Sequence, residues 1–357
     1  MNFHYKNLPD NTVLSLIAPT ASGKTDLACQ LYETGRFELI SVDSALIYQD
    51  MNIGTAKPSD DELTRFPHHL VNIIKPTETY NVASFVADVD TLITQSHQQG
   101  KIPLLVGGTM MYYMALLDGL SAVPDTNPDT RTQVMTWLYE KGIDELYAYL
   151  QQHDPQICQR LKVSDTQRIT RAVEVHLQTG VPMSKWQNTP KSALCHNPNQ
   201  HWLTFSVEPD RAWLHDRIAR RLDIMWEMGF VDEVVALLKK YPDLTAEMPS
   251  MRCVGYRQVI EFLAVVGHEV MQMNDYWGQF SSLMQAQWHN LPKKLQKQPP
   301  NPIQMACQDM KNKALYATRQ LAKRQSTWQR SLARLDGASA SVIVPFPSIQ
   351  EVQKQLL

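Results

Sequence analysis

The sequence predicts an α/β fold: a parallel sheet core, an all-helical insertion domain and a helical C-terminal region. Three observations support this prediction. Short apolar runs alternate with helical segments over the first 120 residues, strand signals are absent from about 121 to 200, and capped helices dominate the remainder. With 357 residues, 43% hydrophobic and 20% charged, the chain can bury about two cores. This composition excludes disordered, low-complexity and collagen-like classes.

Five short runs have the character of strands, because each is apolar or β-branched and bounded by turn residues. They are residues 13–18, 39–42, 70–74, 102–106 and 202–207. Helices are predicted from Lys24, and from about Val82 with Asn81 as N-cap and Gly100 just beyond the end. Strands that alternate with helices imply right-handed crossovers and a parallel sheet.

Helix caps define the insertion domain. Asn127 precedes Pro128, Asp154 precedes Pro155, and Ser164 with Gln167 forms a capping-box pattern for a helix that ends at Gly180. Further on, one helix should end at Gly229 and another before Pro242. We therefore divide the chain into a core (1–120), an insertion (121–200), a completed core with C-terminal helices (201–335) and a tail (336–357). Residues 275–303 are predicted to be an extension loop, since four prolines occur in 291–302.

The cysteines and the hydropathy indicate the compartment. Cys29, Cys158, Cys195, Cys253 and Cys307 are odd in number and never at C-x-x-C spacing, which excludes a disulfide framework and a zinc knuckle. The first residues, MNFHYKNLPDN, lack the apolar segment of a signal peptide, and no apolar run reaches the ~18 residues of a membrane span. A cytoplasmic monomer is the expectation.

Positive charge is concentrated in one stretch, although the net charge is only −2. Residues 311–334 contain no acidic residue, which makes the stretch a candidate nucleic-acid surface. Its basic residues are Lys311, Lys313, Arg319, Lys323, Arg324, Arg330 and Arg334.

A phosphate-binding loop follows the first predicted strand. The run VLSLIA leads into PTASGKT and then a helix, the context that a P-loop requires. Backbone amides and Lys24 would hold a di- or triphosphate, and the Thr25 hydroxyl would bind Mg²⁺. Ala18 stands where the motif has glycine, at a cost of about 1 kcal/mol if that position needs positive φ. The sheet is thus a P-loop NTPase-like core, with the loop formed by Ala18, Pro19, Thr20, Ala21, Ser22, Gly23, Lys24 and Thr25.

The signals of common P-loop enzymes are missing. No N-K-x-D motif indicates a GTPase, and the strand IPLLV ends in Gly107, Gly108 and Thr109 without a Walker-B carboxylate. Asp43 does follow a strand, and a carboxylate at the end of a strand adjacent to the P-loop strand would face the bound phosphate. It could take a proton from a substrate. It could also be an N-cap or an outer-shell ligand of magnesium.

Several motifs together resemble the bacterial tRNA dimethylallyltransferases, also called tRNA isopentenyltransferases (the IPP transferase family). They cover nearly all of residues 11–334, in the order of the family. Residues 276–302 look longer than in the usual bacterial chain, and the cysteine and histidine finger of some eukaryotic relatives is absent. The motifs are APTASGKT, ELISVDSALIYQDMNIGTAKP, LLVGGTMMYY, DTQRITRAVEV, MRCVGYRQ and ATRQLAKRQSTW.

The resemblance implies transfer of a dimethylallyl group from dimethylallyl diphosphate to N6 of the adenosine 3′ of the anticodon, in tRNAs that read codons beginning with U. Asp43 would be the general base, Arg221 a diphosphate contact and Thr109 a neighbour of the acceptor base, with Mg²⁺ on Thr25. The residues implied in tRNA binding are Asp43, Ser44, Ala45, Leu46, Thr109, Arg131, Gln167, Arg168, Ile169, Thr170, Arg171, Arg252, Cys253, Val254, Gly255, Tyr256, Arg257, Lys323, Arg324 and Gln325.

Taken alone, the residues leave alternatives open. Arg217, Arg220 and Arg221 could be a solvated basic face, Arg131 an ordinary first-turn residue, and the glycine pair at 107–108 a plain turn. Trp328 is expected to anchor a core rather than to stack on a base. Two other functions are compatible with the motifs: a P-loop kinase of a nucleoside or small metabolite, and a nucleotide-switched RNA-binding protein.

Overall fold

The computed structural model describes residues 3–289, 301–332, 334 and 341–357. The chain divides into two compact units, which we call the core unit (Met1–Met114 with Asn197–Leu357) and the insertion unit (Ala115–His196). The sequence interpretation put the insertion at 121–200, and the insertion unit runs from Ala115 to His196.

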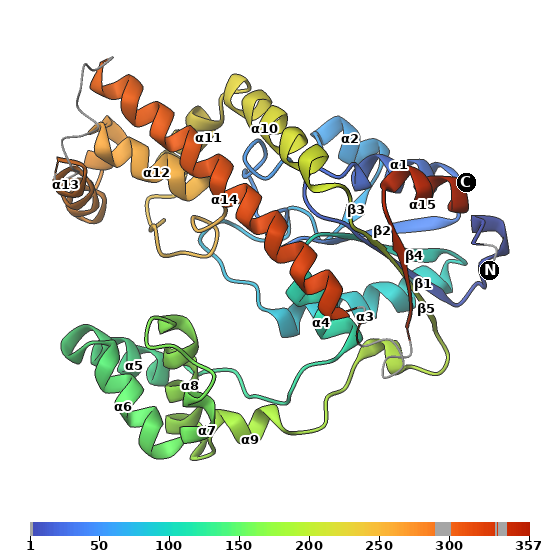
Figure 1. The fold of residues 1–357 in the computed structure, drawn as a ribbon, viewed down its shortest axis with the longest axis horizontal. Coiled ribbons are helices and arrows are strands. Elements are labelled where there is room, and N and C mark those ends of the chain that lie inside the picture. The colour runs from blue at the N-terminus through green and yellow to red at the C-terminus, as the bar shows by residue number, and fades with distance from the viewer. Residues whose placement is uncertain (1–2, 290–300, 333, 335–340) are drawn as a thin grey trace. The chain divides into compact units, whose positions relative to one another are not determined.

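The core unit contains a six-stranded sheet in which every pairing is parallel, with the order β3-β2-β4-β1-β5-β6 (Figure 1). The predicted parallel α/β fold is therefore confirmed. The strands are β1 (Thr12–Ile17), β2 (Phe37–Val42), β3 (His68–His69), β4 (Ile102–Gly107), β5 (His201–Val207) and β6 (Val342–Phe346).

The strand predicted at 70–74 is wrong. Only His68–His69 pair with β2, and Leu70 and Asn72 follow with φ of 63° and 57°. Left-handed residues break the extended geometry of a ladder. The side chain of Asn72 has a different use, since Lys57 Nζ donates to its Oδ1 at 2.5 Å.

Residues 342–356 are structured, whereas the sequence interpretation put a tail at 336–357; residues 336–340 lie outside the described residues. β6 pairs with β5 at the edge of the sheet, and the rings of Phe205 and Phe346 lie 5.1 Å apart. Helix α15 (Ile349–Leu356) packs against the sheet core through Ile349, Val352 and Leu356. Pro345 weakened the strand signal, although an edge strand tolerates proline.

Helices of the core unit begin and end largely where the caps predict. Asn81 accepts from the Ser84 amide, Gly100 has φ 69°, and Gly229 has φ 89° between two helices. Besides α15 they are η1 (Tyr5–Asn7), α1 (Lys24–Glu33), α2 (Asp60–Arg65), α3 (Val82–Gln98), α4 (Met110–Leu117), α10 (Arg211–Glu227), α11 (Phe230–Lys240), α12 (Tyr256–Val265), η3 (Glu269–Gln272), α13 (Asp275–His289) and α14 (Pro302–Leu332).

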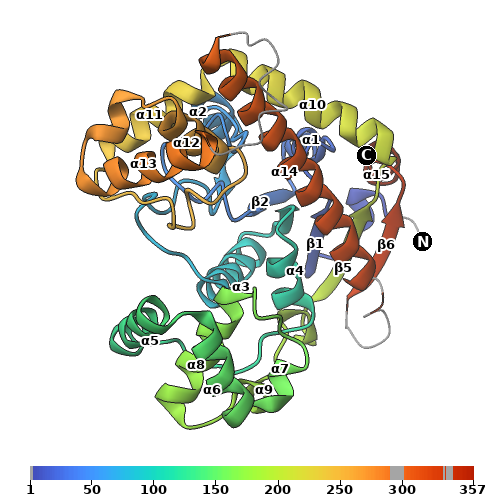
Figure 2. The ribbon, with the colours of Figure 1, turned by 60° about the vertical axis from the view of Figure 1, so that its left-hand side comes forward.

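The predicted extension loop at 275–303 is wrong over its first half, because α13 occupies Asp275–His289; residues 290–300 lie outside the described residues. Trp277 of α13 is fully buried in a cluster formed with α10, α11, α12 and α14. The long helix α14 runs beside α10 and α12 (Figure 2). No helix in the described ranges combines the length and apolar character that crossing a membrane needs.

The insertion unit has its own core, built around the buried side chains of α5, α6 and α8. Asn127 and Asp154 cap helices that begin with proline, as predicted. The predicted capping box is wrong: Asp165, not Ser164, is the N-cap residue, and its side chain makes no cap bond. The helices are α5 (Pro128–Lys141), α6 (Ile143–His153), α7 (Pro155–Cys158), α8 (Thr166–Thr179), α9 (Met183–Gln187) and η2 (Leu194–His196).

Candidate active site

The P-loop links β1 to α1 and curls through two left-handed residues. Gly23 has φ 91°, and Ala21 has φ 62°. Ala18 does not have positive φ, so the strain considered at that position does not arise; it falls on Ala21 instead. Ala18 continues the line of β1, and its amide faces the carbonyl of Gly107 at 3.5 Å.

The cradle presents polar groups that fit an anion. Gly23 is the N-cap of α1, and no side chain in the described part of the chain bonds to that helix end. Its free amides carry partial positive charge. Ser22 Oγ is buried without a hydrogen-bond partner among the described residues, and Thr25 is exposed at the first turn. The described residues contain no cluster of three or more His, Cys, Asp or Glu that could hold a metal.

Two arginines of α10 reach the loop. Arg217 Nε donates to the Ala21 carbonyl at 2.7 Å, and Arg221 Nη1 donates to Thr20 Oγ1 at 3.4 Å. Burial lowers the pKa of Arg221, and nearby Asp43 opposes that shift. The solvated-face alternative describes Arg220, which is exposed and paired with Asp216; Arg217 is also exposed but is bonded to the loop.

Burial also acts on Lys24. It lowers the pKa of the ammonium to about 8; Asp43 raises it and Arg221 lowers it. Lys24, Arg221 and Asp43 therefore share one electrostatic environment. Because the cations are desolvated there, their interaction with a phosphate group would be stronger than at an exposed surface.

Asp43 lies directly after β2, but β2 does not neighbour β1 as expected. Strand β4 separates them and ends in Gly107 and Gly108. A Cβ on Gly107 would lie 2.0 Å from the Val42 carbonyl oxygen, and one on Gly108 would lie 2.5 Å from Gln325 Nε2. The pair is therefore more than a plain turn, because a side chain at Gly107 would collide with the β2 backbone and one at Gly108 with Gln325 of α14.

The environment of Asp43 joins several motifs. Its Oδ1 accepts from the Ala45 amide at 2.8 Å, which fixes the side chain within its own turn. Burial and then Asp43 raise the pKa of the Cys253 thiol to about 12. Tyr113, also next to Asp43, is fully buried and donates to the Leu16 and Leu105 carbonyls. The Asp43 carboxylate is thus close enough to Lys24, to Arg221 and to Cys253 of the MRCVGYRQ motif to affect the pKa of each.

Thr109 connects β4 to the Asp43 turn. Its Oγ1 accepts from the Ser44 amide at 2.9 Å and donates to Ser44 Oγ at 3.2 Å. Its own amide donates to the Val42 carbonyl at 3.1 Å. The hydroxyl therefore orders the turn after Asp43.

Two glutamines hold helix α14 against the P-loop and the ends of β1, β4 and β5, a role that the sequence did not indicate. Gln325 accepts from the Thr20 amide at 3.2 Å and donates to the Gly108 carbonyl at 2.8 Å. Gln329 donates to the carbonyls of Ile17 and Val207. A spacing of four residues on a helix was the only sequence signal for this face.

The basic side of α14 points elsewhere. Lys323 and Arg324 are exposed, as a phosphate-binding role requires, whereas Gln325 is 8% exposed and is occupied by the P-loop. The side chain of Gln325 is therefore occupied in this structure, and its contact with tRNA stays a prediction. Trp328 is 40% exposed, so the expectation of a core anchor is wrong.

The segment Arg252–Arg257 has two exposed ends and a buried interior. Arg252 Nε donates to the Glu247 carbonyl at 2.6 Å, and Arg257 pairs with Glu261 at 3.0 Å. Tyr256 is fully buried, so its predicted contact with tRNA is not available to its side chain. Cys253 and Val254 are half-buried between them.

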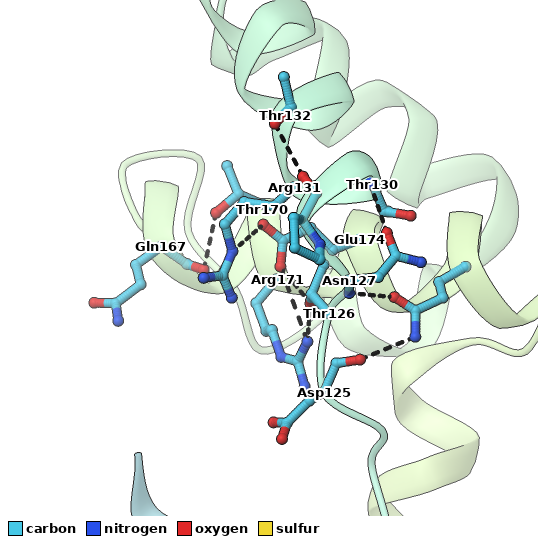
Figure 3. Close-up of polar contacts among 12 residues, drawn as sticks. Asp125, Thr126, Asn127, Thr130, Arg131, Thr132, Gln167, Thr170, Arg171 and Glu174 are labelled. Carbon is cyan, nitrogen blue, oxygen red and sulfur yellow. Dashed lines mark hydrogen bonds and ion pairs between the residues drawn. The ribbon is translucent and has the colours of Figure 1, made fainter. Parts of the chain in front are cut away.

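In the insertion unit, one buried carboxylate connects Arg131 and Arg171 (Figure 3). Glu174 accepts from Thr126 Oγ1 at 2.7 Å, and the two guanidinium groups lie 3.9 Å from it. Arg171 Nη2 also donates to the Pro124 carbonyl at 2.7 Å. Arg131 is thus part of a network rather than a plain first-turn residue, and Glu174 was missed because the sequence marks it only as part of a helix.

The helix that carries Arg171 presents a mixed set. Gln167 and Arg168 are exposed, and Arg168 pairs with Asp165 at 3.0 Å. Ile169 is 0% exposed in the core of the insertion unit and Thr170 is nearly buried, which excludes direct contact of the Ile169 side chain with RNA. Beside Arg131, a shallow hollow of about 560 Å³ extends along α5 to Met135 and Tyr139, which is 92% exposed.

The lowered pKa of Lys24 leads to a prediction for the pH dependence of diphosphate binding. Below about pH 8 the ammonium is charged in the free protein, and above it the charge is lost. Diphosphate affinity should therefore fall as the pH rises through 8, and binding near pH 8 should take up protons. Isothermal titration with inorganic pyrophosphate between about pH 7 and 9.5 measures both effects. Lys24→Arg is the control, because arginine stays charged; if both proteins show the same pH profile, Lys24 does not titrate there.

Fold and site together define a class: a P-loop α/β protein with a phosphate cradle at the carboxyl ends of parallel strands and an acid across the crevice. A model of the family described as IPP transferase matches residues 46–332, and the chain belongs to that family.

Individual relatives agree. The chain is 58% identical over 325 residues to the tRNA dimethylallyltransferase of Psychrobacter sp. (strain PRwf-1), over 91% of this chain and 86% of the relative. It is 46% identical over 329 residues to that of Acinetobacter baumannii (strain SDF), over 90% and 91%. The family assignment favours the prenyltransferase over the kinase alternative.

Two solved structures have the same fold. The full-length tRNA isopentenylpyrophosphate transferase from Bacillus halodurans aligns with a TM-score of 0.57 and 25% identity, over 97% of this chain and 94% of that one. A eukaryotic dimethylallyltransferase acting on tRNA aligns with a TM-score of 0.67 and 22% identity, over 97% and 76%. The second likeness concerns the fold alone.

Proposed function

We propose that this protein transfers a dimethylallyl group from dimethylallyl diphosphate to N6 of adenosine 37, next to the anticodon, in tRNAs that read codons beginning with U. The product is N6-isopentenyladenosine. The observation that carries the proposal is the shared environment of Asp43, Lys24 and Arg221 at the P-loop, in a chain 58% identical to a tRNA dimethylallyltransferase.

The reaction has two electrostatic demands. The allylic C–O bond breaks and diphosphate leaves with negative charge, while the new C–N bond leaves a proton on the attacking nitrogen. In the proposal, the loop amides, Lys24 and Arg221 stabilise the leaving charge as it develops. The Asp43 carboxylate accepts the proton as general base. Desolvation of Lys24 and Arg221 favours stabilisation of the leaving diphosphate, because a lower local dielectric strengthens their electrostatic attraction to the departing oxygen.

Thr109 positions the turn in which Asp43 lies, through its bonds with Ser44. The prenyl group is proposed to pass from the loop to the base at the end of β4, where Thr109 follows the glycine pair. The adenine would be turned out of the anticodon loop to reach it, as enzymes that act on a base generally require.

The metal proposed for the site is Mg²⁺, held by Thr25 and by the diphosphate oxygens. When bound, it would neutralise charge on the leaving group. We also propose that the protein acts as a cytoplasmic monomer.

Binding of tRNA is assigned to residues with exposed side chains. Arg131, Gln167, Arg168 and Arg171 serve in the insertion unit, each exposed or half-exposed. In the core unit the exposed residues proposed for contact with RNA are Ser44, Arg252, Arg257, Lys323 and Arg324. The half-buried Asp43, Ala45, Leu46, Thr109, Cys253 and Val254 are proposed to line the base pocket.

The direct test is nucleoside mass spectrometry. Incubating the protein with dimethylallyl diphosphate, Mg²⁺ and tRNA from cells that lack the modification should add the mass of one prenyl group to one adenosine per tRNA. An RNA-binding switch would leave every nucleoside unchanged. Phosphorylated product from ATP and metabolites, without modified tRNA, would favour a kinase.

A salt series tests the α14 surface. Replacing both Lys323 and Arg324 by alanine should weaken tRNA binding and reduce the slope of log K against log salt, by up to about 0.9 for each phosphate that the protein no longer neutralises. The matched control is Lys6→Ala together with Lys354→Ala, two exposed lysines outside the predicted tRNA-binding segments. Equal slopes for the Lys323 and Arg324 variant and for wild type would place the RNA backbone on another surface.

A further inference from the structure

The carboxylate of Glu233, in the first turn of α11, accepts hydrogen bonds from three consecutive backbone amides of another segment. The Asn52 amide donates to Oε2 at 2.9 Å, the Ile53 amide to Oε2 at 2.6 Å, and the Gly54 amide to Oε1 at 3.1 Å. These amides end the stretch that begins with Asp43. The three consecutive bonds therefore fix the far end of the catalytic turn and its continuation.

The same carboxylate holds a second segment. Tyr256 Oη donates to Glu233 Oε1 at 2.6 Å, and Tyr256 belongs to the segment Arg252–Arg257. Burial and then Glu233 raise the pKa of Tyr256, so the phenol remains a donor. Four donors from two distant parts of the chain thus share one carboxylate.

The residues around Glu233 are closely packed. A Cβ on Gly54 would lie 2.1 Å from Phe230 Cε2 and 2.6 Å from Tyr256 Cε2, and a Cβ on Gly255 would lie 2.7 Å from Phe230 Cε1. The rings of Phe230 and Tyr256 meet edge to face at 5.0 Å. The two segments can approach α11 this closely only because each has a glycine at the contact.

Glu233 acts as a hydrogen-bond acceptor rather than as half of an ion pair. Within the described ranges no Lys, Arg or His side chain forms an ion pair with it. Lys57, whose lowered pKa it partly restores, donates instead to the Tyr48 carbonyl and Asn72 Oδ1. The negative charge is therefore available to the four donors, and bonds to a charged acceptor are the strong ones.

The two segments meet again at the active site. One begins at Asp43 and reaches Glu233 at residues 52–54; the other leaves Glu233 at Tyr256 and returns at Cys253, which packs against the same hydrophobic cluster as Tyr48. We infer that Glu233 is a positioning residue, which sets the Asp43 segment and the Arg252–Arg257 segment against each other and so shapes the pocket for the tRNA adenine. This inference rests on the proposed function.

Glu233→Gln tests it. The amide has the same shape, but its NH₂ group cannot accept the donors that face one carboxylate oxygen. We expect the KM for tRNA to rise about ten- to hundredfold, the range that loss of bonds to a charged group gives. The Kd of inorganic pyrophosphate should stay within about twofold of wild type, because none of the four donors to Glu233 belongs to the P-loop. Tyr256→Phe, which removes one of the four bonds, should raise the KM less.

Glu269→Gln is the matched control, since it removes the same charge from an exposed carboxylate paired with Lys239. Glu233→Asp keeps the charge on a shorter arm and serves if the glutamine variant does not fold; it should shift the KM for tRNA in the same direction. The inference is overturned if Glu233→Gln and Glu233→Asp keep the wild-type KM for tRNA. It is also overturned if these two variants bind pyrophosphate more weakly in the same proportion as they bind tRNA. Failure of the wild-type protein to modify tRNA would instead refute the proposed function.

Discussion

Asp43→Asn is expected to reduce kcat by about two to four powers of ten, the usual contribution of a general base. Asparagine keeps an Oδ1 that can accept from the Ala45 amide, so the turn should survive while the proton acceptor is lost. Affinities for tRNA and pyrophosphate should change little. Single-turnover measurement of modified adenosine, with binding measured separately, distinguishes chemistry from binding.

Asp61→Asn, on the exposed side of α2, is the control for the loss of one carboxylate. If Asp43→Asn weakens tRNA or pyrophosphate binding as much as it slows turnover, Asp43 has a structural role and the base must be sought elsewhere. A wild-type rate for this variant would remove Asp43 from the mechanism.

The second large effect is expected at Arg221. Replacing it with alanine should lower kcat by about two to three powers of ten, the cost of losing one donor to developing negative charge. The guanidinium is desolvated and bonded to Thr20 of the loop, so its field acts where the diphosphate would leave. Steady-state kinetics with varied dimethylallyl diphosphate measure the loss.

The neighbouring Arg220 provides a matched control, because it is exposed and paired with Asp216. Arg220→Ala should remain within about twofold of wild type, as surface pairs contribute little. Equal losses at 220 and 221 would point to a general effect of charge on α10 rather than to contact with the leaving group.

The sheet could be predicted from the sequence because its strands are continuous apolar runs and its helices carry strong caps. The predictions that failed concern segments whose conformation depends on the rest of the fold. Residues 70–74 look like a strand, but Leu70 and Asn72 adopt left-handed conformations that no periodicity reveals. Pro345 made the edge strand β6 hard to recognise in the sequence. The prolines after residue 291 made the segment that contains α13 look like a loop.

For the site, the sequence supplied the P-loop and Asp43, since their chemistry is local to a motif. It could not supply the strand order, so β4 was not expected between Asp43 and the loop. Nor could it indicate the contacts of Gln325, Glu174 or Glu233, whose partners lie 217, 48 and about 180 residues away. Such contacts exist only after folding, and neither hydrophobic period nor helix spacing encodes them.

The place of β4 between β2 and β1 has a consequence for the length of the donor. Adjacent strands lie ~4.8 Å apart, so two intervals put roughly 10 Å between the strand that ends at the acid and the one that ends at the cradle. Main-chain hydrogen bonds between the strands set this distance, and point substitutions of side chains do not change it. A bulkier or longer alcohol diphosphate would meet the same fixed interval, so adapting the protein to such donors would require changing side chains near this interval rather than moving its two ends.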